Sequence, residues 1–302
     1  MTVVYRRKSS KVSDKRRLHS KDILDATECF DDKYCIGIGG YGSVFRAELE
    51  GGSTYAIKLL HSVEDFTDEK AFHAEIQVLT KVRHRCIVKL HGYCSHSKCK
   101  FLVYDFIQRG SLASNLQDEH LAKELNWSRR VAIVKDVAQA LSYLHHDYDT
   151  PIIHRDIKSS NILLDCDFKA CVSDFELSST MAFTDKCDVY SFSVLTMEVV
   201  MGKHPGDLLL PFFCRTEQCT KLKDILDHRI IVPTSDEEKD IILLMLMLVA
   251  FACLQICPKA KQKMQQAYQA LTNRSCPTVI LRPIHEVKLQ DLHDFCSTIQ
   301  TI

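Results

Sequence analysis

The sequence predicts an α+β fold in two lobes: a small β-rich lobe up to about residue 107, then a larger helical lobe up to about residue 272. In the first part, short alternating apolar and polar segments are separated by glycines, which is typical of strands and hairpins. After Arg109-Gly110 the apolar residues recur at helical spacing. The 302 residues are 46% hydrophobic and 26% charged, so the chain is large enough to bury a sizeable core.

Residues 1–19 form a basic tail, which contains seven Lys and Arg residues and a single acidic residue, Asp14. Such a stretch is typical of a solvated chain end. The alternative is peripheral contact with an anionic membrane surface. The formal net charge of the whole chain is zero, so no global charge favours a nucleic acid as partner.

The small lobe begins with a predicted helix in SKDILDATECF, for which Ser20 is a candidate cap. The next segment, SVFRAEL, alternates with strand period and places Phe45, Ala47 and Leu49 on one face. Gly51-Gly52 follows and predicts a hairpin turn into the strand around YAIK.

An amphipathic helix is predicted in DEKAFHAEIQVLTKV, because Phe72, Ile76 and Leu79 fall on one helical face. CIVKLHGYC and KFLVYDFI return to strand character. In the large lobe we expect helices in SLASNLQ, WSRRVAIVKDVAQALSYLHHDY and CDVYSFSVLTMEVVMG.

The most apolar run covers residues 241–254, which is short for a bilayer span and favours a buried helix. After Thr272 the regular pattern is lost. The sequence has 14 cysteines, with no signal peptide and no regular spacing. This combination predicts reduced thiols and a cytoplasmic location.

A glycine-rich motif, GIGGYG, contains Gly37, Gly39 and Gly42. Dinucleotide-binding folds use the same G-x-G-x-x-G spacing, but there a helix follows, whereas here a strand follows. The motif therefore favours a β-turn that covers a triphosphate, with backbone N–H groups close to the phosphates. The alternative is a flexible hairpin without a ligand.

Two further motifs supply charged side chains for phosphoryl transfer. Lys58 lies on the strand after the hairpin and Glu75 on the amphipathic helix, a pair suited to orienting a triphosphate. HRDIKSSN fits the catalytic-loop pattern H-R-D-L-x-x-x-N. In it, Asp156 can accept a hydroxyl proton, Lys158 can neutralise the transferred phosphate and Asn161 can hold a metal.

With these motifs, the chain resembles the cytoplasmic kinase domain of plant leucine-rich-repeat receptor-like serine/threonine kinases. The similarity also extends through ATECFDDKYCIGIGGYGSVFRAEL, LSYLHHDYDTPIIHRDIKSSNILLD and KCDVYSF. It implies a bilobal protein-kinase fold that uses ATP and Mg²⁺ to phosphorylate protein hydroxyls. The domains would be a juxtamembrane-like tail (1–19), an N-lobe (20–107), a C-lobe (108–272) and an irregular C-terminal tail (273–302).

The resemblance also implies roles for individual residues. Tyr104 would be the gatekeeper beside the adenine-binding hinge of Asp105 to Ile107. Asp174 would bind metal together with Asn161, and Asp188 would anchor the catalytic loop from below. The remaining nucleotide contacts would come from Ile36, Val44 and Ala56 beside the three glycines. The expected partners are a protein substrate or a partner receptor kinase.

The chain departs from the family pattern after Asp174. Glu176 stands where the family has the glycine of D-F-G, and Asp188 follows Asp174 after only 14 residues. Such a connection can span about 45–50 Å, but it leaves no room for a full activation segment. No A-P-E is present, and Lys261 replaces the arginine that would pair with its glutamate. These departures favour an alternative, a pseudokinase that binds nucleotide or a partner kinase without efficient catalysis.

A zinc site is a competing interpretation of HGYCSHSKC, which contains His91, Cys94, His96 and Cys99. The residue types suit zinc. However, they fall on a predicted strand-turn-strand and lack the paired C-x-x-C spacing, which favours a hairpin without metal.

Overall fold

The computed structural model describes residues 19–40, 42–60, 66–96, 99–175, 184–206, 221–230, 263–273, 286–288 and 290–292. The basic tail up to residue 18, Glu176, the apolar run 241–254 and Lys261 lie outside these residues. The chain divides into two compact units. The described residues of the first unit come from 19–83 and 87–108, and those of the second from 84–86, 109–175 and 184 onward. The lobe boundaries expected from the sequence stay predictions.

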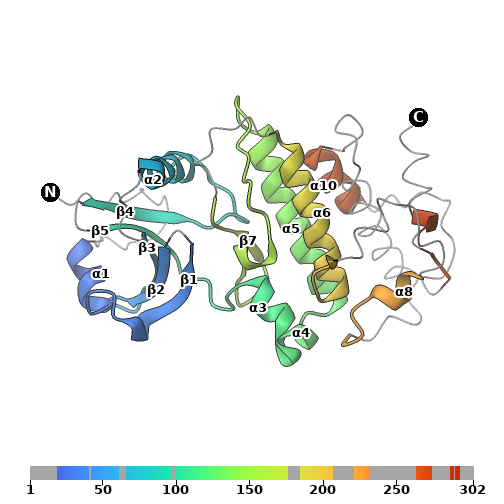
Figure 1. The fold of residues 1–302 in the computed structure, drawn as a ribbon, viewed down its shortest axis with the longest axis horizontal. Helices are drawn as coiled ribbons and strands as arrows, with labels where there is room; N and C mark the ends of the chain where they lie inside the picture. The colour runs from blue at the N-terminus through green and yellow to red at the C-terminus, as the bar shows by residue number, and fades with distance from the viewer. Residues whose placement is uncertain are drawn as a thin grey trace. The chain divides into compact units, whose positions relative to one another are not determined.

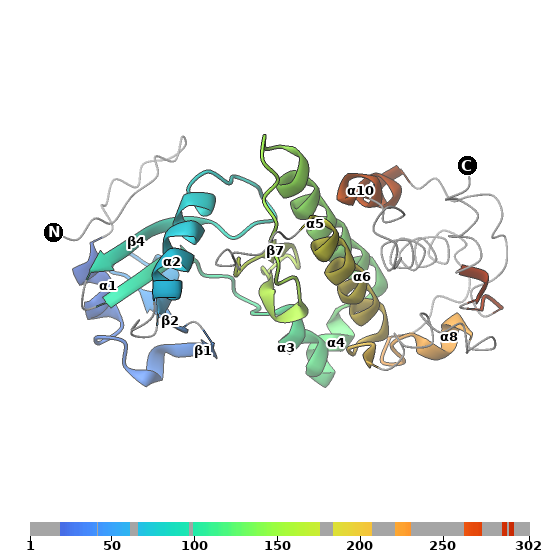
Figure 2. The ribbon, with the colours of Figure 1, turned by 45° about the horizontal axis from the view of Figure 1, so that its top comes forward.

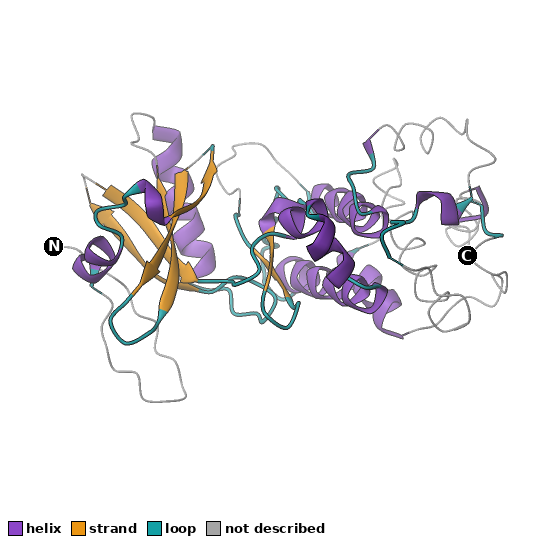
Figure 3. Cartoon of the chain, turned by 90° about the horizontal axis from the view of Figure 1, so that it is seen from below, coloured by secondary structure: helices purple, strands orange, loops and turns teal. Residues whose placement is uncertain are grey.

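The first unit is built on a five-stranded antiparallel sheet with the order β1-β2-β3-β5-β4 (Figures 1 and 3). Consecutive strands pair as hairpins, except that β5 lies between β3 and β4. Gly51 and Gly52 form the turn after β2 with φ of 108° and 83°, as the glycine pair predicted. The strands are β1 (Cys35–Gly39), β2 (Gly42–Glu48), β3 (Thr54–Leu60), β4 (Leu90–His96) and β5 (Cys99–Asp105).

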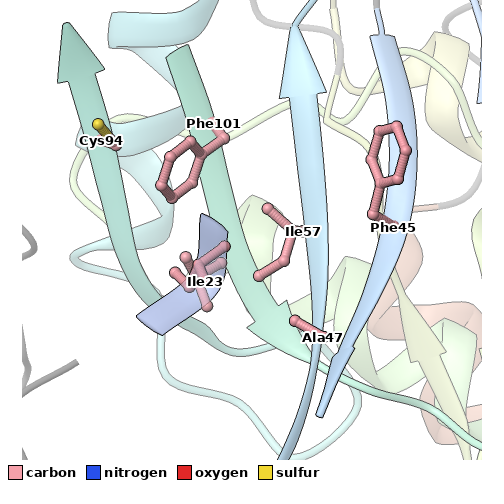
Figure 4. Close-up of a cluster of buried hydrophobic side chains, with 7 residues drawn as sticks. Ile23, Phe45, Ala47, Ile57, Cys94 and Phe101 are labelled. Carbon is pink, nitrogen blue, oxygen red and sulfur yellow. The ribbon is translucent and has the colours of Figure 1, made fainter. Parts of the chain in front are cut away.

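One face of this sheet carries a hydrophobic core that is covered by helix α1 (Ser20–Ala26) (Figure 4). Ile23 of α1 is fully buried against side chains of four strands. The alternation predicted for SVFRAEL is confirmed, because Phe45 and Ala47 are buried while Arg46 and Glu48 are exposed. The cluster comprises Ile23, Phe45, Ala47, Ile57, Cys94, Phe101 and Val103.

Ser20 is not the cap of α1, as the sequence suggested, but its first helical residue. The N-cap is His19, whose backbone N–H donates to the Asp22 carboxylate at 3.3 Å. The carboxylate at the third helical position thus accepts the backbone N–H of the N-cap residue, as in one half of a capping box.

Helix α2 (Phe66–Leu79) confirms the helix predicted in this region. Phe72, Ile76 and Leu79 are buried, as their helical spacing predicted. The first unit also contains η1 (Asp32–Tyr34), a single 3₁₀ turn between α1 and β1.

The second unit is mainly helical, and α5 lies beside α6 and α10 (Figure 2). A small two-stranded sheet, β6 paired with β7, packs against α5. The elements are α3 (Leu112–Gln117), α4 (Glu119–Glu124), α5 (Trp127–His146), η2 (Ser159–Asn161), β6 (Ile162–Leu164), β7 (Ala170–Val172), α6 (Lys186–Met201), α8 (Leu222–Ile225) and α10 (Met264–Asn273).

A buried arginine connects several of these elements. Arg130 of α5 is fully buried and donates to the carbonyl of Leu125 at 2.8 Å and to the Asp227 carboxylate at 2.6 Å. It also donates to the carbonyl of Val199 in α6. Burial lowers the pKa of Arg130, against the attraction of Asp227. The desolvation cost of this ion pair is compensated by the hydrogen bonds that Arg130 donates.

Within the described residues, no helix has the length and apolarity that a membrane crossing needs.

Candidate active site

The first unit brings Lys58, Glu75 and Tyr104 together. Lys58 Nζ lies 3.4 Å from Glu75 Oε2, which joins β3 to α2 as the sequence predicted. The Tyr104 hydroxyl of β5 donates to the other oxygen, Glu75 Oε1, at 2.5 Å. Glu75 is 5% exposed, so its charge is compensated by side chains from two strands.

Strand register places the predicted nucleotide contacts on one face of the sheet. Val44 pairs with Lys58, and Ala56 pairs with Tyr104. Directly paired residues share a face, as do residues two apart along a strand. All four side chains therefore lie on the face opposite the core cluster that contains Ile57.

The glycines of GIGGYG differ in what the fold requires of them. A Cβ at Gly42 would lie 2.3 Å from the backbone oxygen of Leu59, so the sheet itself excludes a side chain there. A Cβ at Gly37 would meet nothing within 4 Å, and one at Gly39 would make only an ordinary contact. The fold leaves the space beside these two glycines open, and nearby Ile36 is 51% exposed.

The predicted hinge begins at Asp105, which ends β5. Its carboxylate lies 2.5 Å from His91 Nε2 of β4, and its backbone N–H donates to the carbonyl of Lys89. Ile107 follows as a half-buried residue.

The residues of the alternative zinc site are otherwise engaged. His91 contacts the Asp105 carboxylate and Cys94 lies in the hydrophobic core, so these two residues do not come together as zinc ligands. Among the described residues, no cluster of His, Cys, Asp and Glu suited to a metal ion is found.

In the second unit, the three predicted catalytic-loop residues lie in contact. Lys158 Nζ is 2.6 Å from Asp156 Oδ2. The Asn161 amide donates to that same Oδ2 and to the backbone oxygen of Asp156, both at 2.8 Å. Both N–H bonds of the Asn161 amide are thereby used on Asp156, which orients the side chain.

Asp188, in the first turn of α6, anchors the loop. Its fully buried carboxylate accepts the backbone N–H groups of His154 and Arg155, each at 2.8 Å. His145 Nε2 of α5 is a third partner at 2.8 Å. Arg155 has a φ of 73°, a conformation that costs free energy for a residue with a side chain. The Asp188 hydrogen bonds hold it there.

His154 is fully buried beneath the loop, and its contacts define its tautomer. Nε2 lies 2.9 Å from the carbonyl of Ser173, which can only accept, so Nε2 carries the proton. Nδ1 accepts the backbone N–H of Asp156 at 3.3 Å. Burial lowers the pKa of His154, and this effect outweighs the attraction of Asp188. The ring is therefore neutral and links Ser173, just after β7, to the catalytic loop.

Asp174 follows β7 and has a φ of 56°, so the backbone turns sharply at the predicted metal ligand. The next residue, Phe175, is buried with its ring 4.5 Å from the His154 ring. Ser173 donates its N–H and its hydroxyl to the carbonyl of Asn161, at 2.9 and 3.0 Å. These contacts connect the Asp174 turn to the Asn161 end of the catalytic loop.

Sequence reasoning missed several residues that hold the site. Nothing in the spacing pointed to the contact between Tyr104 and Glu75 or to His145 as a partner of Asp188. The same holds for the hydrogen bonds of Ser173 and for the bond from the Ser159 hydroxyl to the Glu198 carboxylate of α6 at 2.7 Å. The only signal was that Ser159 is a polar residue within HRDIKSSN and that Ser173 immediately precedes Asp174. The predicted residues form two groups, one in each unit. The group in the first unit comprises Val44, Ala56, Lys58, Glu75 and Tyr104. The group in the second unit comprises Asp156, Lys158, Asn161 and Asp174.

A family model described as protein tyrosine and serine/threonine kinase matches residues 31–187, more than half of the 302-residue chain. The chain therefore belongs to the protein kinase family. The matched range holds every residue of both groups and ends immediately before Asp188.

Within that class, the chain is similar to plant leucine-rich-repeat receptor-like kinases. MDIS1-interacting receptor like kinase 2 of Arabidopsis thaliana is 40% identical over 279 residues, 82% of this chain and 26% of that protein. A probable leucine-rich repeat receptor-like protein kinase of the same plant is 40% identical over 274 residues, 81% of this chain and 24% of that protein. A leucine-rich repeat receptor-like serine/threonine-protein kinase is 34% identical over 284 residues, 83% and 26% respectively. The chain spans about a quarter of the length of these relatives.

Proposed function

We propose that this chain is an ATP-dependent serine/threonine protein kinase that transfers the γ-phosphoryl group of ATP to a protein hydroxyl. The observation that carries the proposal is the contact of Asp156 with both Lys158 and Asn161. A base, a cation and an amide-oxygen ligand within one short loop are the parts that phosphoryl transfer needs on the acceptor side.

Each residue of the loop has a separate role in this reaction. The hydroxyl oxygen of the substrate attacks the γ-phosphorus, the bond to the leaving ADP oxygen breaks, and Asp156 accepts the hydroxyl proton. Lys158 compensates negative charge on the transferred phosphoryl group. The neutral His154 fixes the backbone N–H of Asp156 and so orients the base.

The first unit supplies the nucleotide contacts. Lys58, held by Glu75, would bind the α- and β-phosphates. The fold itself does not need glycine at positions 37 and 39, since a Cβ there would meet no close neighbour. Glycine at these positions is explained by a phosphate chain that approaches the backbone closely. Tyr104 would stand as gatekeeper beside the adenine. The backbone of Asp105 to Ile107, with Ile36, Val44 and Ala56, would hold the base.

The residues present also fit Mg²⁺. Both N–H bonds of the Asn161 amide are used on Asp156, so its Oδ1 is the atom that can ligate a cation. The Asp174 carboxylate would be the second protein ligand. When bound with ATP, magnesium neutralises the phosphates.

The test is phosphate transfer from labelled ATP to a generic basic protein, with Asp156→Asn and Lys58→Met as variants. We expect transfer by the unchanged chain and a loss of about 10³-fold or more in Asp156→Asn. Nucleotide binding, measured by thermal shift with Mg-ATP, should persist in Asp156→Asn and weaken in Lys58→Met. A rate that is equal in the unchanged chain and in Asp156→Asn would contradict the proposed chemistry.

The second candidate is the pseudokinase, which the D-F-E sequence and the missing A-P-E favour. It predicts Mg-ATP stabilisation without transfer, so the same two measurements separate it from the kinase. As partners, we propose a protein substrate or a receptor kinase, and as location the cytoplasmic side of the cell, from the similarity to receptor-like kinases.

A further inference from the structure

We propose that Ser159 and Glu198 form a second anchor of the catalytic loop on α6, and that this anchor positions Asn161 for its metal. Ser159 Oγ donates to Glu198 Oε1 at 2.7 Å. Neither residue touches the reacting atoms, so both are positioning residues. The inference rests on the proposed function, since it concerns the magnesium that the kinase reaction uses.

The two anchors lie at opposite ends of one helix. Asp188 stands in the first turn of α6, and Glu198 stands in its last turn, ten residues or about 15 Å further along the axis. Asp188 fixes the beginning of the loop through the backbone of His154 and Arg155. Glu198 fixes its end through the side chain of Ser159. One helix thus holds both ends of the loop, while the contact between the base and the metal ligand is made directly by the Asn161 amide on Asp156.

Asn161 depends on this second anchor through η2. Ser159 begins this single 3₁₀ turn, and Asn161 ends it, with the backbone N–H of Asn161 donating to Lys158 at 2.9 Å. Ser159 is 7% exposed, and its hydroxyl is the side-chain link from the turn to α6. Asn161 itself is hydrogen-bonded to Asp156 and Ser173, and η2 also packs against α3, but neither of these contacts joins the turn to α6.

The bond between Ser159 and Glu198 is well suited to positioning the loop, because its acceptor is a carboxylate and its donor is a short side chain. A hydroxyl that donates to an ionised carboxylate makes a stronger bond than a neutral pair. Serine has a single side-chain torsion to order, so little entropy is lost in holding it. Groups that orient a metal ligand from outside commonly change metal affinity by 10- to 100-fold when removed.

The experiment measures Mn²⁺ binding by the electron paramagnetic resonance of free Mn²⁺, in the presence of a non-hydrolysable ATP analogue. Ser159→Ala should raise the Mn²⁺ concentration for half-maximal binding by about tenfold. Affinity for the analogue without metal should stay unchanged, because Lys58 and the hinge bind it. Ser159→Thr and Glu198→Gln, which keep a donor and an acceptor, should remain within about threefold of the unchanged chain.

The matched control is Ser193→Ala. Ser193 is a buried serine of α6, the helix of Glu198, and its hydroxyl donates to the carbonyl of Tyr190 within that helix and not to the catalytic loop. It should leave the Mn²⁺ requirement unchanged. If Ser159→Ala does not fold, Glu198→Ala removes the same bond from the other side. The double variant should be no worse than either single one, because both remove one interaction.

Three outcomes overturn the inference. An unchanged Mn²⁺ requirement in Ser159→Ala removes the positioning role. A defect in Glu198→Gln that is larger than that of Ser159→Ala shows that the charge of Glu198 acts on the metal by itself and not through the bond. Absence of metal-dependent nucleotide binding in the unchanged chain overturns the proposed function together with the inference, whereas the first two outcomes leave the proposed function intact.

Discussion

Each unit of the molecule buries one carboxylate among its predicted site residues, and the two carboxylates are held in different ways. Glu75 in the first unit is compensated by two side chains, the ammonium of Lys58 and the hydroxyl of Tyr104. Asp188 in the second unit accepts two backbone N–H groups and one histidine. The first arrangement is made of movable side chains, and the second is built into the main chain.

This difference separates two kinds of dependence. The partners of Glu75 can rotate away and find water if the carboxylate is lost, because Lys58 and Tyr104 lie on regular strands that do not need it. The partners of Asp188 cannot, because the backbone N–H groups of His154 and Arg155 are fixed in a loop with a positive φ. The first unit is therefore expected to tolerate loss of its carboxylate better than the second.

The largest expected effect is that of Asp188→Ala. Two buried backbone donors and His145 Nε2 lose their acceptor, and the strained conformation at Arg155 loses its support. We expect a loss of about 3–5 kcal/mol in the free energy of unfolding, measured by urea denaturation. Asp185→Ala, three residues earlier at the start of the same helix and without a side-chain capping bond, is the control and should change stability little.

If Asp188→Ala is too unstable to purify, Asp188→Asn keeps one acceptor oxygen and should be intermediate. A variant at Asp188 as stable as the Asp185 control would show that the loop does not depend on this carboxylate.

Glu75→Ala should have a smaller effect, a loss of about 1–2 kcal/mol, since Lys58 and Tyr104 lose a partner but can relax towards solvent. The ratio of the two losses is the sharpest measure of the comparison. Equal losses for Glu75→Ala and Asp188→Ala in the same urea titration would contradict the distinction between side-chain and main-chain partners.

The same division explains how much the sequence could predict. The loop residues Asp156, Lys158 and Asn161 are five positions apart or fewer, so motif spacing alone places them together. Alternation also predicted the buried face of β2. The contact of Tyr104 with Glu75 joins residues 29 apart, and that of Ser159 with Glu198 joins residues 39 apart. Such contacts depend on how a helix packs on a strand or loop, which local pattern does not encode.

The pH dependence of stability tests the second unit further. Burial lowers the folded-state pKa of His154 below that of the unfolded chain, about 6.5. Between the two pKa values the unfolded chain binds more protons, so the stability due to neutral His154 is complete above pH 6.5 and is lost as the pH falls below it. The slope contributed by this group is at most about 1.4 kcal/mol per pH unit.

His154→Tyr keeps a ring against Phe175 but cannot titrate in this range. The free energy of unfolding should therefore depend less on pH in this variant between about pH 5 and 6.5. His84 and His146, whose pKa values are also lowered by burial, remain in both proteins and cancel in the difference. Parallel pH curves for the two proteins would show that His154 is not the neutral, buried group described above.

The smallest expected effect is that of Tyr104→Phe, which removes one hydroxyl and leaves the ring and Lys58 in place. Loss of its hydrogen bond to Glu75 should reduce the free energy of unfolding by about 0.5–1.5 kcal/mol. In the Glu75→Ala background the same substitution should cost clearly less, because the Glu75 carboxylate is already absent. Should the full cost persist in that background, the hydroxyl would be stabilising the sheet through another group and not through Glu75.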